Sequence, residues 1–310
     1  MKKNWKAIIM QAFIFSILLM PCITSLAGGN VMDTSSAAVG MVEMGDGSFL
    51  TTDSYNKVIW KQQNGISEIY AGMPGVPGIY GEPQGGYRDD SLSQALFGSP
   101  WAIVPFKGGY AVSDPANNVV RLIYDNKVRT VNLKVALSNP TGLAVDGDGA
   151  LYISDTNNNI IRRVTKEGSV TTWLTGLSEP TGLYFKNGLL YIADSGNNRI
   201  LKAESGNISA VIGGMSEGYG DGDYQQAMFA NPMGLAVDDD GTIYVADTGN
   251  SAIRKIQNGA VTTLLINRGT ELSNVPVSPV GLLLKGDSLY MCDMFSRTII
   301  AIPKEEDVNQ

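Results

Sequence analysis

The sequence contains no histidine, the side chain that most catalytic triads, proton shuttles and zinc sites require. Only two of its 310 residues are cysteine, and only 17% are charged. The formal net charge is −7. An acidic chain is a poor binder of nucleic acid, because that binding depends on Lys and Arg neutralising phosphates. Hydrophobic residues make up 44% of the chain, which excludes wholesale disorder and allows a sizeable core.

Long apolar runs are also scarce, and the one that stands out lies near the N-terminus. Three lysines precede a largely apolar stretch, Ala7 to Met20, which a small-residue cleavage motif follows at Ala27. This layout predicts a signal peptide at residues 1–27 and a secreted or extracytoplasmic protein with no membrane span after processing. The stretch is shorter than the ~20 residues of a spanning helix; an uncleaved anchor and lipid attachment at Cys22 are the alternatives. A processed chain would have a net charge of −10 and Cys292 as its only cysteine.

The rest of the chain repeats one pattern six times. A clear copy, NPTGLAVDGDGALYISDTNNNIIRRVTKEGSVTTWLTG, starts at Asn139, and other copies start near residues 38, 99, 179, 231 and 278. Each copy divides into short β-branched and aromatic runs separated by Gly, Asn and Asp, which is typical of hairpin-linked strands. Four strands in each unit of about 40–50 residues predict an all-β fold, a six-bladed β-propeller over residues 28–310.

The sixth unit contains residues for only three strands, because the chain after Ile302 is short and charged. An open strand edge would be an aggregation hazard. We therefore expect residues 29–35, which precede the first unit, to supply the outer strand of the last blade and to close the ring.

The second predicted strand of every unit ends in aspartate, and asparagine follows three residues later in five units and serine in the sixth. On these features the units resemble NHL repeats, a family of six-bladed propellers, over essentially the whole mature chain. The histidine typical of that family is replaced here by Lys, Asn, Ser or Arg at a turn position. We interpret the aspartates as structural, since a carboxylate at a strand end accepts turn amides. They are Asp53, Asp114, Asp155, Asp194, Asp247 and Asp293.

Two connections between units are longer than the others and share a pattern, GYRDDSLSQALFGSPWAI and GYGDGDYQQAMFANPMGL. Bacterial NHL proteins often contain this connector. We expect both connectors to lie on the face that holds the turns after the strand-ending aspartates. Phe97 and Phe229 are expected to pack between blades, and Asp89 and Asp221 to hold loop amides.

Ligand contacts are predicted mainly at connector residues that are aromatic or charged. The candidates are Tyr80, Glu82, Tyr87, Arg88, Asp90, Trp101, Tyr219, Asp223 and Tyr224. No cofactor is predicted. Asp221-Gly222-Asp223 leaves a calcium site open as an alternative, although two carboxylates are too few to form one alone.

Residues for known propeller chemistries are scarce. The lyases and paraoxonase-type enzymes among six-bladed propellers rely on histidine, and the gluconolactonase type needs carboxylate and amide groups where the inner strands begin. Here those positions are occupied by Val39, Trp101, Thr141, Thr181, Met233 and Val280. Cys292 is expected to be an inert core thiol, and Arg121, Arg162 and Arg254 to form a repeated solvated row.

These features favour a non-enzymatic binding or scaffold protein that recognises an extracytoplasmic protein, peptide or glycan. The alternative is a metal-dependent hydrolase or lyase similar to regucalcin and gluconolactonase.

Overall fold

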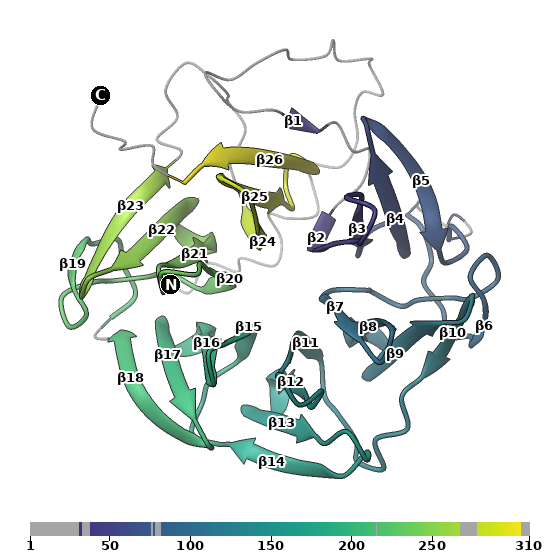
Figure 1. Ribbon diagram of the computed structural model, residues 1–310, viewed down its shortest axis with the longest axis horizontal. Helices are drawn as coiled ribbons and strands as arrows, with labels where there is room; N and C mark the ends of the chain where they lie inside the picture. The colour runs from purple at the N-terminus through teal and green to yellow at the C-terminus, as the bar shows by residue number, and fades with distance from the viewer. Residues whose placement is uncertain are drawn as a thin grey trace, which may run out of the picture.

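The computed structural model describes residues 31–32, 38–75, 77, 82–214, 216–266 and 278–304. Their strands form six antiparallel sheets arranged as blades around a central axis (Figure 1). This arrangement confirms the all-β, six-bladed propeller expected from the six repeats. The described helices are single 3₁₀ turns, and none of them has the length and apolar character that a membrane crossing requires. The predicted signal peptide and Tyr80 lie outside the described residues.

The first three blades follow one another in chain order. Blade 1 consists of β2 (Ala38–Glu43), β3 (Phe49–Asp53), β4 (Val58–Gln63) and β5 (Ile66–Ala71). Blade 2 consists of β7 (Ile103–Phe106), β8 (Gly109–Asp114), β9 (Val119–Tyr124) and β10 (Lys127–Thr130), with β6 (Asp90–Ser91) as a fifth strand. Blade 3 consists of β11 (Pro140–Val145), β12 (Leu151–Asp155), β13 (Ile160–Val164) and β14 (Val170–Leu174).

The other three blades complete the ring. Blade 4 consists of β15 (Pro180–Lys186), β16 (Leu189–Asp194), β17 (Arg199–Glu204) and β18 (Asn207–Gly213). Blade 5 consists of β20 (Pro232–Val237), β21 (Ile243–Asp247), β22 (Ala252–Gln257) and β23 (Ala260–Ile266), with β19 (Gly222–Asp223) as a fifth strand. Blade 6 consists of β24 (Pro279–Lys285), β25 (Ser288–Asp293), β26 (Thr298–Pro303) and β1 (Val31–Met32). The 3₁₀ turns are η2 (Pro115–Asn117), η3 (Thr156–Asn158), η4 (Ser195–Asn197) and η5 (Thr248–Asn250).

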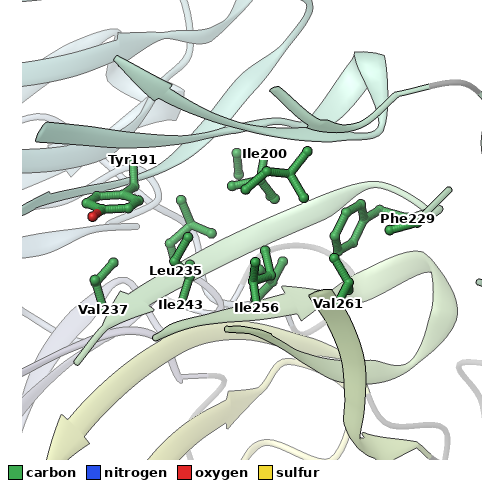
Figure 2. Close-up of a cluster of buried hydrophobic side chains, with 12 residues drawn as sticks. Tyr191, Ile200, Phe229, Leu235, Val237, Ile243, Ile256 and Val261 are labelled. Atoms are coloured by element: carbon green, nitrogen blue, oxygen red, sulfur yellow. The ribbon is translucent and has the colours of Figure 1, made fainter. Parts of the chain in front are cut away.

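The hydrophobic core is divided among the six junctions between neighbouring blades. One cluster combines Tyr191 and Ile200 of blade 4 with Phe229, Leu235 and Ile243, which belong to blade 5 or its connector (Figure 2). The other clusters of the described residues join blades 1 and 2, 2 and 3, 3 and 4, 5 and 6, and 6 and 1 in the same way. The second strand of a blade is therefore covered on both faces, and every residue of β3, β12 and β21 is buried.

Glycine allows the innermost strands to approach one another near the axis. A Cβ atom on Gly142 would collide with the carbonyl oxygen of Thr181 in the next blade, and one on Gly234 would collide with that of Val280. The same contact joins Gly281 of blade 6 to Val39 of blade 1, so the inner strands of the last and first blades are in contact. A larger side chain at these positions would separate the blades.

Parts of both long connectors lie against the turns that follow the aspartates, as expected, since Asn117 and Asn250 donate to the carbonyls of Gly86 and Gly218. Another part of each connector reaches the outer rim of a blade, where β6 pairs with β10 and β19 pairs with β23 (Figure 1). Two residues of the outer strand of blade 2, and two of blade 5, are thereby paired with a further strand, which shields part of each edge. Phe97 and Phe229 are each at most 1% exposed and pack at the junctions of blades 1 and 2 and of blades 4 and 5, which confirms their predicted position.

Strand β1 lies beside β26, with Val31 opposite Ile300 and Met32 opposite Ile299. Those two residues are the described part of the segment 29–35 that we expect to complete blade 6. The closure of the ring by this whole segment stays a prediction.

Candidate functional site

The turns after the strand-ending aspartates all lie at one end of the propeller, which we call the turn face. Each aspartate is at most 1% exposed. Asp155 accepts the amide of Ser138 at 2.7 Å and Asp194 accepts that of Ser178 at 2.7 Å. Asp247 and Asp293 accept the amides of the corresponding residues at the entries of blades 5 and 6.

The asparagine three residues later donates its Nδ2 to the same aspartate in five blades, at 2.7–2.9 Å. The residue after that asparagine, or after Ser296 in blade 6, has a left-handed conformation in all six blades, with φ between 52° and 65°. These carboxylates therefore fix the turns through hydrogen bonds that use their oxygen atoms. Among the described residues, no group of three or more His, Cys, Asp or Glu side chains is placed to hold a metal ion.

Near the central axis, hydroxyl groups at the turn face bond to the innermost strand of the next blade. Ser195 donates to the carbonyl of Pro232 at 2.6 Å, and Thr248 donates to that of Pro279 at 2.6 Å. One residue before the aspartate, Ser113 and Ser154 also donate to carbonyls of the next blade, those of Thr141 and Thr181. Each hydroxyl proton is thus directed at the neighbouring blade, so this ring links the blades together.

Arg121 and Arg254 are fully buried, which corrects the expectation of a solvated row. Arg254 contacts Asp247 at 2.8 Å and Asp221 at 2.6 Å, and its guanidinium lies between the rings of Tyr219 and Phe229, about 5 Å from each. It also donates to two connector carbonyls. Of the three arginines, only Arg162 is partly exposed, in a blade that has no long connector before it.

The same clamp holds the first connector. Arg121 contacts Asp89 at 2.7 Å and Asp114 at 3.4 Å, between the rings of Tyr87 and Phe97. Asp89 also accepts the amide of Thr130 at 2.9 Å. Burial opposes ionisation of Asp89, but hydrogen bonds from Thr130 and Arg121 outweigh it and hold the pKa of this carboxyl below its ordinary value. Asp89 therefore ties the connector to a blade strand, whereas the sequence predicted a tie to loop amides.

Several predicted ligand residues are used within the connectors. Arg88 donates to the carbonyl of Gln94, Asp90 accepts the amide of Ser91, and Asp223 accepts turn amides. Tyr224 is half-buried against the cluster shared by blades 4 and 5. Trp101 is half-buried at the inner end of blade 2, against the cluster shared by blades 6 and 1.

The remaining candidates keep more open surface. Tyr87 is 56% exposed and Tyr219 38% exposed, although their hydroxyls bond to Thr130 and Thr263. Glu82 is half-buried, and its Oε2 has no hydrogen-bond partner among the described residues. The eight predicted residues that the structure describes are therefore not gathered into one site.

A different cluster on the turn face was missed by the sequence analysis. The turns after Asp53 and Asp293 meet where Arg297 lies over the ring of Tyr55, 4.3 Å from its centroid. Beside Arg297, Phe295 is 60% exposed and Met294 is 37% exposed. We call these four residues (Tyr55, Met294, Phe295 and Arg297) the Phe295 patch.

The two residues that follow the strand-ending aspartate differ between the blades, and this difference in the sequence indicates the patch. In blades 3, 4 and 5 the aspartate is followed by small polar residues, Thr156-Asn157, Ser195-Gly196 and Thr248-Gly249. Blade 6 has Met294-Phe295 there, and blade 1 has Ser54-Tyr55. Blade 2 has Pro115-Ala116, so only the first and last units have an aromatic residue at the second position. These two aromatic residues mark the patch, whereas the contact between their turns depends on the ring bringing the first and last units together.

The repeated Asp–Asn turns, the buried inter-blade clusters and the glycine contacts at the hub together define a propeller of the NHL class. A family model described as the teneurin NHL domain matches residues 120–283, more than half of the chain. The chain belongs to the NHL-repeat β-propeller family.

Relatives with curated descriptions share only part of their length with this chain. Teneurin-3 of Danio rerio is 33% identical over an alignment of 148 residues that covers 41% of this chain and 5% of the teneurin. NHL repeat-containing protein 2 of Gallus gallus is 47% identical over 68 residues, which are 22% of this chain and 9% of that protein. The chain thus spans less than a tenth of either relative.

Solved structures resemble the whole propeller at low sequence identity. Virginiamycin B lyase from Staphylococcus aureus is 14% identical, with a TM-score of 0.62 over 89% of this chain and 98% of the lyase. An auxiliary nutrient binding protein from Bacteroides thetaiotaomicron is 14% identical, with a TM-score of 0.67 over 87% of this chain and 69% of that protein. At this identity, the likeness shows the fold alone.

Proposed function

We propose that this protein is an extracytoplasmic recognition module whose propeller binds a protein or peptide partner at the turn face. The observation that carries the proposal is the Phe295 patch, where two large apolar side chains are exposed beside an arginine stacked on tyrosine. Exposed apolar groups that cluster, and are not scattered singly, mark interaction sites on soluble proteins. Aromatic residues and arginine are also the residue types enriched among the anchors of protein interfaces.

The chemistry of the patch indicates the kind of partner. Phe295 and Met294 offer apolar contact area, and Arg297 adds a positive charge to a chain that is acidic overall. A partner segment with an apolar or aromatic side chain next to a carboxylate would satisfy both features. The sequence-predicted contacts Tyr87 and Tyr219 are further candidates at the rim.

The solved structures that share the fold include both a binding protein and an enzyme. A structural neighbour is described as a nutrient binding protein, and another is described as a lyase, so the same fold serves both classes. A metal-dependent hydrolase or lyase remains the second candidate because of that lyase. In this chain, however, an ion at the hub would have to draw the strand-ending carboxylates away from the turn amides that they hold.

The test uses residues 28–310 as bait against the extracytoplasmic fraction of the source cells. Replacing Phe295→Ser and Arg297→Ser together should reduce retention of the partner about tenfold or more, as expected for the loss of two interface anchors. Tyr124→Ser is the matched control, since Tyr124 is 53% exposed on a blade 2 hairpin. Equal retention by both variants, or no protein retained by the unmodified bait, would contradict the proposal.

Metal analysis of the same purified protein addresses the alternative. A stoichiometric divalent ion whose removal by chelator lowers the melting temperature would favour the hydrolase or lyase. Fractionation of cells that express the full chain addresses its location, and we expect the mature form outside the cytoplasm.

A further inference from the structure

A recess of about 330 Å³ lies at the junction of blades 6 and 1, at the end of the strands opposite the turn face. Its wall is formed by the β2–β3 turn, the β4–β5 hairpin, and Lys285 and Tyr290 of blade 6. This volume is at the lower end of the range for small-molecule sites, which suits a ligand of one or two rings.

Gln62 is the unusual residue of this recess. It pairs with Phe49, the first residue of β3, and the equivalent positions of the other blades are all apolar: Ile123, Val164, Ala203, Ile256 and Ile302. Thr51 is unusual in the same way, because its equivalents are Val112, Ile153, Ile192, Val245 and Met291. Blade 1 therefore faces blade 6 with two polar side chains where the repeat has apolar ones.

The amide of Gln62 is left incompletely bonded. Its side chain is 4% exposed, and Nε2 donates to Thr51 Oγ1 at 3.3 Å. Its Oε1 has no hydrogen-bond partner among the described residues. Exchanging the oxygen and nitrogen of the amide does not remove the problem, since one of the two atoms then still lacks a partner. A buried polar atom without a partner is destabilising, so its place on the wall of a recess points to a ligand that completes the bond.

The charged groups around the recess balance one another. Lys285 pairs with Glu43 at 2.9 Å, and Lys61 pairs with Asp46 at 2.9 Å. A hydrogen bond from Ser48, reinforced by Lys61, holds the pKa of Asp46 well below its ordinary value, so this carboxylate is an acceptor at neutral pH. The lining thus offers donors and acceptors without a net charge, which favours a neutral polar ligand over an ion.

Aromatic rings complete the lining. The Phe49 and Tyr290 rings lie 5.1 Å apart at 44° to each other, and the Lys285 ammonium covers the face of Phe49 at 4.5 Å. Tyr290 is half-buried at the recess. Aromatic rings beside amide, ammonium and carboxylate groups match a molecule that has apolar C–H faces and hydroxyl edges.

We propose that this recess binds a neutral saccharide, with a sugar hydroxyl donating to Gln62 Oε1 and the ring packing near Tyr290. The site is independent of the turn face, so it stands whether or not the Phe295 patch binds a partner. A free sugar and the end of a glycan share this chemistry, and the experiment distinguishes them.

The test is titration of residues 28–310 with glucose, galactose, N-acetylglucosamine and maltose, followed by saturation-transfer NMR and calorimetry. Gln62→Leu should weaken binding of the preferred sugar at least tenfold while leaving the melting temperature unchanged or higher, because it removes the unpaired atom. A purely structural glutamine would instead give a lower melting temperature. Gln257→Leu, on the corresponding strand of blade 5, is the control and should bind normally.

Tyr290→Leu provides a second, independent variant, and it should also weaken binding. Comparing the free sugar with an oligosaccharide that ends in it identifies the source, since a glycan end would bind at least as tightly as the free sugar. The proposal is overturned if none of the four sugars binds below about 10 mM, if Gln62→Leu binds like the unmodified protein, or if glucuronate binds more tightly than glucose. The Phe295→Ser, Arg297→Ser variant should bind the sugar normally, which separates this site from the proposed partner surface.

Discussion

Arg254 lies 2.8 Å from Asp247 although neither side chain has any exposed surface. The same arginine reaches Asp221 of the preceding connector at 2.6 Å. It therefore joins a strand-ending aspartate, which is present in every blade, to a connector that precedes only blades 2 and 5.

Removing this arginine should destabilise the protein strongly. Arg254→Met leaves two aspartates without their cation, one of them fully buried, and breaking a buried ion pair costs about 3–5 kcal/mol. Arg162→Met is the matched control, because Arg162 contacts Asp155 at 3.1 Å but is 20% exposed and holds no long connector. We expect the control to lose about 1 kcal/mol or less in urea unfolding. Equal losses for the two variants would show that the buried clamp contributes no more than an exposed pair.

The free energy of unfolding should be insensitive to pH between 6 and 8. No histidine is present, and no other side chain has an ordinary pKa in that range. Stability should fall below about pH 4, because Asp89 has a lowered pKa in the folded state. Because the pKa of Asp89 is lower in the folded state than its value of about 3.9 in the unfolded chain, ionised Asp89 stabilises the fold at pH values above about 3.9. This contribution is lost as the pH falls through the pKa of the folded state.

Urea unfolding at several pH values, on protein without a histidine tag, measures this profile. Asp89→Asn should reduce the acid sensitivity while lowering stability at neutral pH. A step in stability near pH 6.5 would contradict the expected profile.

The thiol of Cys292 should be unreactive in the native protein. The side chain is fully buried, and burial raises its pKa to about 12, so little thiolate exists at pH 8. In residues 28–310, where it is the only cysteine, a disulfide-exchange reagent should label it only after guanidinium is added. Rapid stoichiometric labelling in native buffer would show instead that the junction of blades 6 and 1 opens readily.

Deleting residues 28–36 should lower the melting temperature sharply, because the deletion exposes the edge of β26 that Val31 and Met32 cover. Val31→Pro with Met32→Pro is the companion variant, since proline removes the backbone donors but keeps the chain length. Thermal melts followed by circular dichroism measure both. An unchanged melt for the deletion would refute closure by this segment.

The fold could be predicted because every unit repeats the same short strand-forming runs and the same kind of turn, for example the one that Asp155 and Asn158 form. The burial of Arg121 and Arg254 could not be read from the repeat, since Arg162 occupies the same position and is partly exposed. What differs is the long connector that covers two of these arginines, and its path along the outer rim depends on pairing between β6 and β10 or between β19 and β23.

The contact between Arg297 and Tyr55 illustrates a second limit. These residues are more than 240 positions apart, and only the circular arrangement places their turns together. Gln62 is a third case, because an isolated glutamine on a strand is unremarkable until its equivalents in the other blades are aligned by register. The repeat therefore predicts the propeller fold, but it does not predict the contacts of residues that depart from the repeat or that depend on the ring.

The glycine contacts at the hub have a consequence for how such a chain can change. Main-chain atoms, and not interchangeable side chains, set the spacing between successive inner strands, and the same spacing recurs from Gly281 back to Val39. A chain that gained or lost one blade would need a different angle between neighbouring blades, and every one of these contacts would have to change together. Insertions between blades and substitutions in the turns do not alter this angle. We therefore expect such chains to diverge mainly in the connectors at the outer rim and in the turns at the two faces of the propeller.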